Sequence, residues 1–525
     1  MKKILSIILT VSVISLSSCQ KWLDINTDPN AVSSVGTQYG LVIPSIELNL
    51  ITNNGLYAQM IGSYLAEHYA VKPEGPNTLH YAQWLTQDGS SLASTANRLY
   101  QYSYVRVINN SKAIRDAAAE SESWGDYLAA TVYRAIAYQT VADAFGEVPY
   151  TEAEKGSAAA APHFDEGPTV YAGIVADLEE ALSHIQGYEE VSENMLFNNS
   201  TKVDNFVKLA NSILLRVLMR ESGKVDVKDK LAALIAEDNF ITADVAFASS
   251  LFANQAGQDN PLYEQFVRGA GNTSAGTTQD LAGHMAVIGT MSEVADARLA
   301  AKFNPSANDG VYEGGFIDTQ YSIEKTSGWA DKGSYSEPVL KYNSPVSVMT
   351  RAEVDFFLAE YYAKIAPDAA KAQAAYEAAI DASFATAGVT GAEDIYGAGK
   401  KYAWDASKAE ELIGIQKWVH LANVNGYESW CELRRLGYPE FNSKTGAEIY
   451  TTWTGIAKSN SATPTTQELV DAGVYTYGTI VTPQSLADMA SNTLLGCLPY
   501  PSSATKTNAN APKQKEKGAK VFWAK

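Results

Sequence analysis

The sequence predicts a mostly α-helical protein, built from helix pairs of the tetratricopeptide type and a second, irregular lobe rich in loops. Two observations lead to this fold class. Apolar residues recur at intervals of three and four before residue 249 and again after residue 348, which is the period of amphipathic helices. In residues 249–348 glycine, asparagine, serine and proline are frequent, and the helical period lapses.

The helical period before residue 249 falls into separate stretches. Each stretch combines an apolar stripe with polar residues on the opposite face, as a helix packed against a core requires. In residues 126–144, for example, Leu128, Val132 and Ile136 form the stripe, while Asp126 and Arg134 lie off it. The predicted helices are residues 37–71, 92–119, 126–144, 169–185, 204–220 and 227–237.

Residues 350–388 predict a pair of antiparallel helices. Pro367 interrupts the helical period and separates the two helices. Small alanines let such helices approach closely, and tyrosines fill the groove between them. The residues that fit a tetratricopeptide repeat are Leu358, Ala359, Tyr362, Ala372, Tyr376 and Ala379. Because one pair cannot bury its apolar faces alone, we expect the earlier helices to supply neighbouring pairs.

The first residues have the pattern of a secretory signal peptide. Lys2 and Lys3 precede an apolar run at residues 4–14, which is too short to span a bilayer, and small residues follow. Residues 16–19, LSSC, resemble a lipobox, in which the cysteine thiol is lipidated and the peptide is cut before it. We therefore predict lipidation of Cys19, which makes a stable anchor when several acyl chains are attached. The alternative is ordinary signal cleavage near a cysteine that occurs there by chance.

These patterns divide the chain into a leader, a tether and a body. We expect the signal peptide at residues 1–18, the lipidated N-terminus and tether at 19–35, and the body at 36–525. Within the body, the predicted helical repeats are residues 36–248 and 349–440, and the predicted loop-rich lobe is residues 249–348 plus 441–525.

Charge and cysteine content exclude several classes of protein. The formal net charge of −19 disfavours binding to nucleic acid and to anionic lipid surfaces. Only Cys431 and Cys497 follow Cys19, so the exported body has no framework of disulfides and must be held together by packing. At 525 residues the chain is long enough to bury a large core.

No motif for catalysis, cofactor or metal binding is found. The six histidines include no HExxH pair, and no GxSxG motif occurs. The GAGKK sequence at residues 397–401 lacks the rest of a phosphate-binding loop, and Asp24, Asn26 and Asp28 begin an EF-hand pattern that Pro29 and Val35 break. We predict a protein that is not an enzyme and has no cofactor. A pair of glycosidase carboxylates among the 59 acidic residues stays open, because only their spacing in space would reveal it.

Several segments together resemble the SusD/RagB family of nutrient-binding outer-membrane lipoproteins, in particular its second, SusD-like branch. The most specific segment contains Gln416, Lys417 and Trp418, followed by Tyr427, Glu428, Trp430, Arg434, Arg435 and Gly437. This sequence departs from the family pattern at two positions. Cys431 stands where the family commonly has a polar residue, and Ala504 stands where the family commonly has glutamate. The other matching segments are DINTDPN, YRAIAYQTVADAFGEVPYTEA, VKLANSILLRVLMR, RAEVDFFLAEYYAK, LPYPSSATKTNAN and KVFWAK.

The resemblance implies about four tetratricopeptide-like helix pairs and an irregular lobe that carries ligand contacts. It further implies a protein anchored by lipid to the outer membrane, on the extracellular side, which captures oligosaccharides or peptides. The implied partner is a TonB-dependent transporter of the SusC type, which receives the ligand. A surface hydrolase and a surface scaffold that binds no nutrient are the alternatives.

The ligand contacts are expected on the irregular segments, because aromatic residues of helix pairs are committed to packing. A sugar offers flat patches of C–H that stack on aromatic rings. Trp418 and Trp430 are therefore predicted in the core. The predicted ligand-binding residues are Tyr81, Trp84, Trp329 and Tyr335, and for each the alternative is that it only pins a loop onto the body.

Overall fold

The computed structural model describes residues 39–71, 79–268, 281–307, 310–316, 335–460, 463–483 and 493–525. The predicted signal peptide, Cys19, the tether and Trp329 lie outside the described residues. None of the helices that the structure describes is long and apolar enough to cross a membrane.

The predicted helices of the first half are present, with one error. The first helix runs as α2 (Tyr39–Thr52), η2 (Asn53–Ala58) and α3 (Gln59–Leu65), so it ends at Leu65 and not at residue 71. Tyr69–Val71 form strand β1 instead. The other predicted helices are confirmed as α5 (Ser91–Gln101), η3 (Tyr102–Ile108), α6 (Asn109–Glu120), α7 (Trp124–Phe145), α8 (Gly167–Ser183), α9 (Val203–Glu221) and α10 (Lys228–Glu237).

The helix pair predicted around Pro367 is also confirmed. It consists of α16 (Arg351–Glu360) with η8 (Tyr361–Ile365), followed by α17 (Ala369–Ala387). Thr350 and Glu353 form a capping box at the start of α16, and Asp368 caps α17. The segment with the most specific family motif folds into α19 (Ala409–Leu421) and α20 (Gly426–Leu436).

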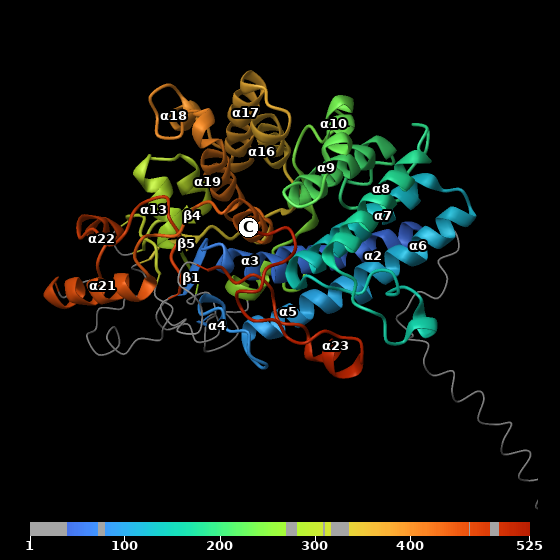
Figure 1. Ribbon diagram of the computed structural model, residues 1–525, viewed down its shortest axis with the longest axis horizontal. Helices are drawn as coiled ribbons and strands as arrows, with labels where there is room; N and C mark the ends of the chain where they lie inside the picture. The colour runs from blue at the N-terminus through green and yellow to red at the C-terminus, as the bar shows by residue number, and fades with distance from the viewer. Residues whose placement is uncertain are drawn as a thin grey trace, which may run out of the picture.

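Neighbouring helices pack as four pairs, which are α6 with α7, α8 with α9, α16 with α17, and α19 with α20. This arrangement confirms the predicted fold class. In Figure 1 the pairs follow one another along the top and right of the molecule, and the short elements gather at the left. In helix α7 all residues from Gly125 to Phe145 are buried, and in α20 all residues from Gly426 to Leu436 are buried.

Short elements build the other side of the molecule. Three two-stranded antiparallel sheets join β1 to β3 (Leu281–Gly283), β2 (Val245–Phe247) to β6 (Val346–Met349), and β4 (Phe303–Asn304) to β5 (Glu337–Pro338). The remaining elements are α4 (Leu79–Ala82), η4 (Gly156–Ala159), η5 (Ser249–Leu251), α11 (Pro261–Tyr263), η6 (Glu264–Arg268), α13 (Met285–Glu293), α14 (Arg298–Lys302), α18 (Glu393–Tyr396), η9 (Ala406–Lys408), α21 (Gly446–Asn460), α22 (Thr466–Asp471) and α23 (Ser502–Thr507).

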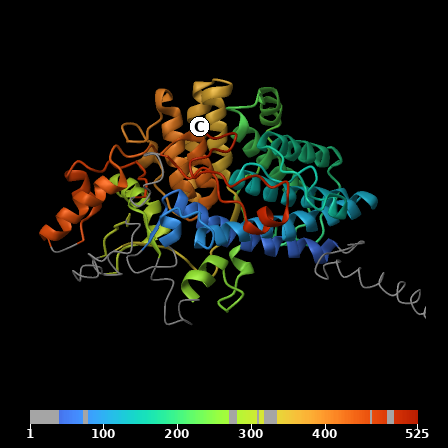
Figure 2. The ribbon, with the colours of Figure 1, turned by 60° about the horizontal axis from the view of Figure 1, so that its bottom comes forward.

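The end of the chain returns to the middle of the molecule. Figures 1 and 2 both place the C-terminus among the central helices. The indole of Trp523 donates to the Asp143 carboxylate on α7 over 3.0 Å, and the Lys525 N–H donates to the Arg434 carbonyl on α20 over 3.1 Å. The last residues thus join two helix pairs that are far apart in the sequence.

Candidate functional site

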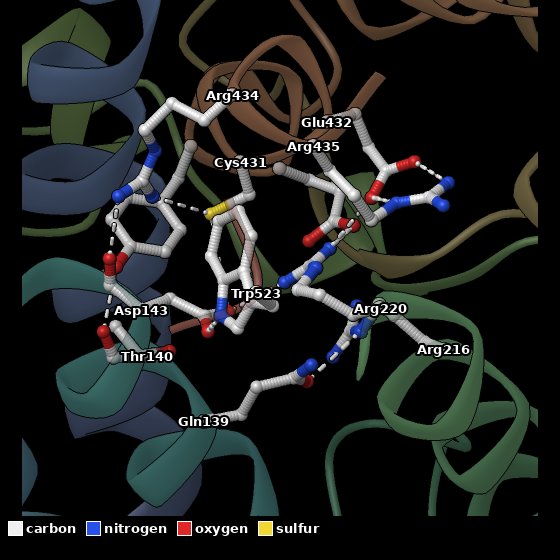
Figure 3. A network of polar contacts seen from close by, with 12 residues as sticks. Gln139, Thr140, Asp143, Arg216, Arg220, Cys431, Glu432, Arg434, Arg435 and Trp523 are labelled. Carbon is white, nitrogen blue, oxygen red and sulfur yellow. Dashed lines mark hydrogen bonds and ion pairs between the residues drawn. The ribbon is translucent and has the colours of Figure 1, made fainter. Parts of the chain in front are cut away.

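Two groups of buried polar residues are candidates for function, and the first is an ionic network at the meeting point of α7, α9 and α20 (Figure 3). At its centre, Arg220 of α9 donates to the Asp143 carboxylate over 2.5 Å and to Glu432 over 3.2 Å, and it also pairs with Glu428. Arg435 extends the network, since it bonds Glu432 over 2.7 Å. We call these residues, with Glu360, Lys417 and Arg434, the ionic network.

Every carboxylate at the centre of the ionic network has a cationic partner. The Glu432 carboxylate by itself contacts three cationic side chains, those of Arg220, Arg435 and Lys417. The Lys417 ammonium nitrogen lies 2.9 Å from a carboxylate oxygen of Glu432. Burial by itself would raise the pKa of Glu432, but these three cations outweigh burial and hold the pKa well below its usual range. Such a network fixes α7, α9 and α20 relative to one another. Its charged groups are paired with each other within the protein.

The side chain of Arg434 contacts an aromatic ring and two backbone carbonyls. Its guanidinium lies over the Trp430 ring, 3.5 Å from the centroid, and donates to the carbonyls of Asp143 and Gly496 over 2.8 and 2.7 Å. Trp418 and Trp430 are buried, as predicted for core residues. Cys431, the departure from the family pattern, is buried in α20 and accepts a hydrogen bond from Arg434.

The second candidate is a hollow on the side of the short elements. It lies between the end of α3, β1, α4, the start of α13 and the segment after β3. It admits a single group of about the size of a water molecule. The residues that line it are Tyr64, Glu67, Tyr69, Ala70, Ala82, Trp84, His284, Phe316, Val481 and Pro483. We call this site the hollow.

Backbone pairing brings the walls of the hollow together from distant parts of the sequence. In the sheet, Ala70 of β1 lies opposite Ala282 of β3. The His284 N–H donates to the His68 carbonyl over 3.0 Å, and the imidazole Nδ1 of His284 accepts from the Ala286 N–H and so caps α13. The hollow is therefore built on hydrogen-bonded backbone and not on side chains alone.

Two residues of the hollow hold strained backbone. Glu67 has φ of 54° and Trp84 has φ of 48°, in the left-handed region that side chains other than glycine rarely adopt. Such a conformation costs about 1–3 kcal/mol per residue, and strained residues gather at functional sites. That both lie in one small hollow makes it a candidate site.

The electrostatics of the hollow are the reverse of those in the ionic network. Glu67 is 3% exposed, and both its carboxylate oxygens accept from the Val481 N–H, over 2.8 and 3.0 Å. Among the described residues no lysine or arginine pairs with it, and the nearest basic atom is Nδ1 of His284 at 3.6 Å. Burial raises the pKa of Glu67 well above its usual range and lowers the pKa of His284 to about 3, so the imidazole is neutral.

Three of the four predicted ligand-binding residues are described, and all three lie at or beside the hollow. Trp84 lines it and is 1% exposed. Tyr81 is 4% exposed, stacks on Tyr64 with 5.4 Å between ring centroids, and bonds the Thr95 hydroxyl over 2.5 Å. Tyr335 is 6% exposed and packs against Ala70 and Ala282. Their ring surfaces are thus largely covered by the protein, and ligand contact through them stays a prediction.

Sequence reasoning did not find Glu67 and His284. A usable signal was present, because Glu67 and His68 lie in the stretch from Ile61 to Val71, whose other residues carry no charged side chain. The partner His284 lies more than 200 residues further along the chain, where no local pattern points back to Glu67. Within the described part of the chain no group of three or more histidine, cysteine, aspartate or glutamate side chains is placed to hold a metal ion.

Comparison with known proteins supplies the family. Residues 29–453 match a SusD-like family described as "Starch-binding associating with outer membrane". Three solved structures share the fold over 93% of this chain. They are a SusD homolog from Bacteroides uniformis (19% identity, 99% of its chain, TM-score 0.68), a chitin-binding SusD homolog from Flavobacterium johnsoniae (18%, 98%, 0.68) and a SusD-like protein from Bacteroides thetaiotaomicron (18%, 98%, 0.65).

Among curated protein sequences, none matches the chain. The family match nevertheless extends from the end of the tether through α20 and into α21, and it includes every segment that forms a helix pair. The protein belongs to the SusD-like family, as its sequence motifs predicted.

Proposed function

We propose that this protein is a surface-exposed, lipid-anchored protein of the outer membrane that binds oligosaccharides and delivers them to a TonB-dependent transporter of the SusC type. The observation that carries the proposal is the hollow, a strained site with aromatic walls on a SusD-like scaffold. Apolar and aromatic walls with a few polar groups are what a small-ligand site requires. The chitin-binding homolog from Flavobacterium johnsoniae, which shares the fold, favours a glycan over a peptide.

The four aromatic residues predicted from the sequence belong to this proposal as ligand contacts. Trp84 lines the hollow, and Tyr81 and Tyr335 support its walls through Tyr64 and Ala70. Trp329 is proposed on its sequence position alone. A sugar unit bound at the mouth of the hollow would place one substituent beside the aromatic walls and the polar atoms of Glu67 and His284.

Binding without hydrolysis is favoured over the hydrolase alternative. Glycosidases act through two carboxyl groups, about 5–5.5 Å apart in retaining enzymes and 6.5–9.5 Å apart in inverting ones. Glu67 is the only carboxylate in the lining of the hollow that the structure describes. The lining therefore offers no partner that could act as the second catalytic carboxylate.

The experiment for ligand binding is calorimetry of the soluble chain that begins after Cys19. The panel contains oligosaccharides of several linkages and short peptides, and each bound ligand is then incubated with the protein and analysed for cleavage. We expect micromolar to millimolar binding of at least one oligosaccharide without new products. If only peptides bind, the ligand is a peptide and not an oligosaccharide. Release of shorter sugars would favour the hydrolase alternative. If nothing in the panel binds, the scaffold alternative is favoured.

Anchor and partner are tested in cells. We expect Cys19→Ala to leave the body folded and to release it from the membrane fraction, because the acyl chains on that residue supply the anchor. Solubilisation of the unaltered protein in mild detergent should recover a TonB-dependent barrel with it. Retention of the Cys19→Ala protein after a carbonate wash would contradict the anchor, and recovery of the protein alone would contradict the partner.

A further inference from the structure

We propose that Glu67 makes the hollow selective for a ligand with a primary ammonium group, specifically an unacetylated amino-sugar unit of an oligosaccharide. The inference rests on the proposed function and adds to it the chemistry of the bound unit. It begins from a contrast, because Glu432 in the ionic network has three cationic partners and Glu67 has none among the described residues.

The described polar atoms around Glu67 include one hydrogen-bond donor to its carboxyl group. The carboxyl oxygens could accept more hydrogen bonds than this one donor supplies. The Val481 N–H is the only hydrogen-bond donor to the Glu67 carboxylate that the described structure contains. The nearby Nδ1 of His284 is itself an acceptor, since it takes the Ala286 N–H over 3.1 Å. The remaining lone pairs of the Glu67 carboxylate oxygens can therefore accept from a ligand, and an ammonium group donates three hydrogen bonds and accepts none.

Size and walls fit the same group. The free space holds one group of about the size of a water molecule, which is also the size of an ammonium group on a sugar carbon. Tyr64, Trp84 and Phe316 are among the lining residues, and aromatic faces attract cations. The net charge of −19 adds long-range attraction for a cationic ligand.

A neutral sugar satisfies the hollow less well. A hydroxyl group can form a hydrogen bond with the protonated carboxyl group of Glu67 but brings no charge, so its binding gains no ion pair. An N-acetyl group is larger than the free space and carries no charge either. The ammonium group alone lets Glu67 ionise in its buried position, because a buried carboxylate is tolerated when it is paired.

Proton balance gives a readout that needs no variant. With the hollow empty, the buried Glu67 carboxyl group holds its proton, and on binding it forms an ion pair with the ammonium group. The Glu67 O–H bond breaks, no covalent bond forms between protein and ligand, and one proton passes to the buffer. Below the pKa of the ligand amine, binding should therefore release about one proton and become tighter as the pH rises.

The experiment compares three tetrasaccharides by calorimetry on the soluble chain. The probes are a β-1,4-linked glucosamine tetramer, its fully N-acetylated counterpart and a glucose tetramer, each at pH 5.5 and 6.5 in two buffers that differ in ionisation enthalpy. We expect the glucosamine tetramer to bind at least about tenfold more tightly than the other two, and to release about one proton. Equal affinities, or no proton release, would overturn the inference.

The matched variants are Glu67→Gln and Glu120→Gln, which make the same substitution in the hollow and at the exposed end of α6. Glutamine still accepts the Val481 N–H, so a melting curve should show that Glu67→Gln folds. We expect this variant to lose the preference for glucosamine and Glu120→Gln to keep it. Unchanged preference in Glu67→Gln would contradict the role of Glu67.

The outcomes separate this inference from the proposed function. Binding of glucose or N-acetylated tetramers without preference for the amine would leave glycan binding intact and overturn the ammonium site. Binding of a lysine peptide alone, lost in Glu67→Gln, would overturn the assignment to an amino sugar. If no oligosaccharide of any kind binds, the proposed function and the inference both fail.

Discussion

The ionic network and the hollow show two ways in which this protein buries carboxyl groups. In the network, Asp143 and Glu432 meet guanidinium groups, so the charges cancel within the protein and join α7, α9 and α20. In the hollow, Glu67 has no cationic partner among the described residues, and burial raises the pKa of its carboxyl group well above its usual range. The difference separates scaffold from site, because only the second arrangement leaves hydrogen-bonding capacity for a ligand.

The largest effect is expected when the network loses its central cation. Arg220→Met should lower the free energy of unfolding by about 3–5 kcal/mol, because it leaves the buried carboxylates of Asp143 and Glu428 without their partner. Urea unfolding of the soluble chain measures this loss. The exposed Lys400, paired with Asp394 at the surface, serves as the control, and Lys400→Met should change the stability little. A loss for Arg220→Met no greater than for the control would show that the network does not hold the helices together.

The next largest effect tests whether the walls of the hollow are as firmly packed as the network. Trp84→Ala should lower the free energy of unfolding by about 3 kcal/mol, since the indole is almost fully buried. Trp84→Phe, which keeps an aromatic wall, should cost much less. Urea unfolding of both variants measures these changes in the free energy of unfolding. Full stability of Trp84→Ala would mean that the ring is free to meet a ligand and is not part of the packing.

The two regions also differ in how far the sequence predicts them. The helices that build the network were predicted because their apolar period is local, and Trp418 and Trp430 were correctly predicted in the core. Within α7 the expected polar face was wrong. Arg134 is buried with Glu154 at 2.9 Å, and Asp126 accepts from the Ser192 N–H over 2.8 Å. These partners lie 20 and 66 residues away, so no helical period could reveal them.

The hollow depends even more on distant partners. Residues 66–71 belong to the helix predicted at residues 37–71, yet the chain turns at Glu67 and forms β1, because residues 281–283 supply the pairing strand. The short range of residue patterns explains this error, since a strand needs a partner that the local sequence does not contain. The aromatic residues near the hollow were predicted because they lie on irregular segments of the sequence. The carboxyl group of Glu67 was not predicted.

A third and smaller effect concerns Lys302, the cationic counterpart of Glu67. Its ammonium group donates to the carbonyls of His420 and Ala422 over 2.8 and 2.6 Å, and burial lowers its pKa from 10.5 to about 7. Between these two values the unfolded chain binds a proton that the folded chain lacks, so the stability falls as the pH is lowered from 10.5 toward 7.

Lys302→Met removes this dependence. Relative to the unaltered protein, the variant should gain about 2 kcal/mol of stability when the pH is lowered from 9.5 to 7.5, whatever constant cost the lost hydrogen bonds add. Unfolding by urea at four pH values gives the slope. Parallel curves for the two proteins would show that Lys302 keeps its proton in the folded state.

The smallest effect on stability is expected from Glu67→Gln. The direction in which this effect changes with pH should differ between the hollow and the ionic network. The pKa of Glu67 is raised in the folded protein, so folding stability is lost as the pH rises above the unfolded value of 4.5. Glutamine resembles the protonated acid. The variant should therefore gain stability relative to the unaltered protein as the pH rises from 5 to 7.5, as measured by urea unfolding.

Glu432→Gln in the ionic network should show the opposite dependence on pH. The cations around Glu432 lower its pKa, so its contribution to stability is present above pH 4.5 and is lost as the pH falls through the folded value. The variant should be clearly less stable than the unaltered protein at pH 7.5, and this deficit should shrink in acid. If Glu67→Gln shows the same deficit at pH 7.5, then Glu67 is ionised and paired in the folded protein, and the hollow is a second piece of scaffold.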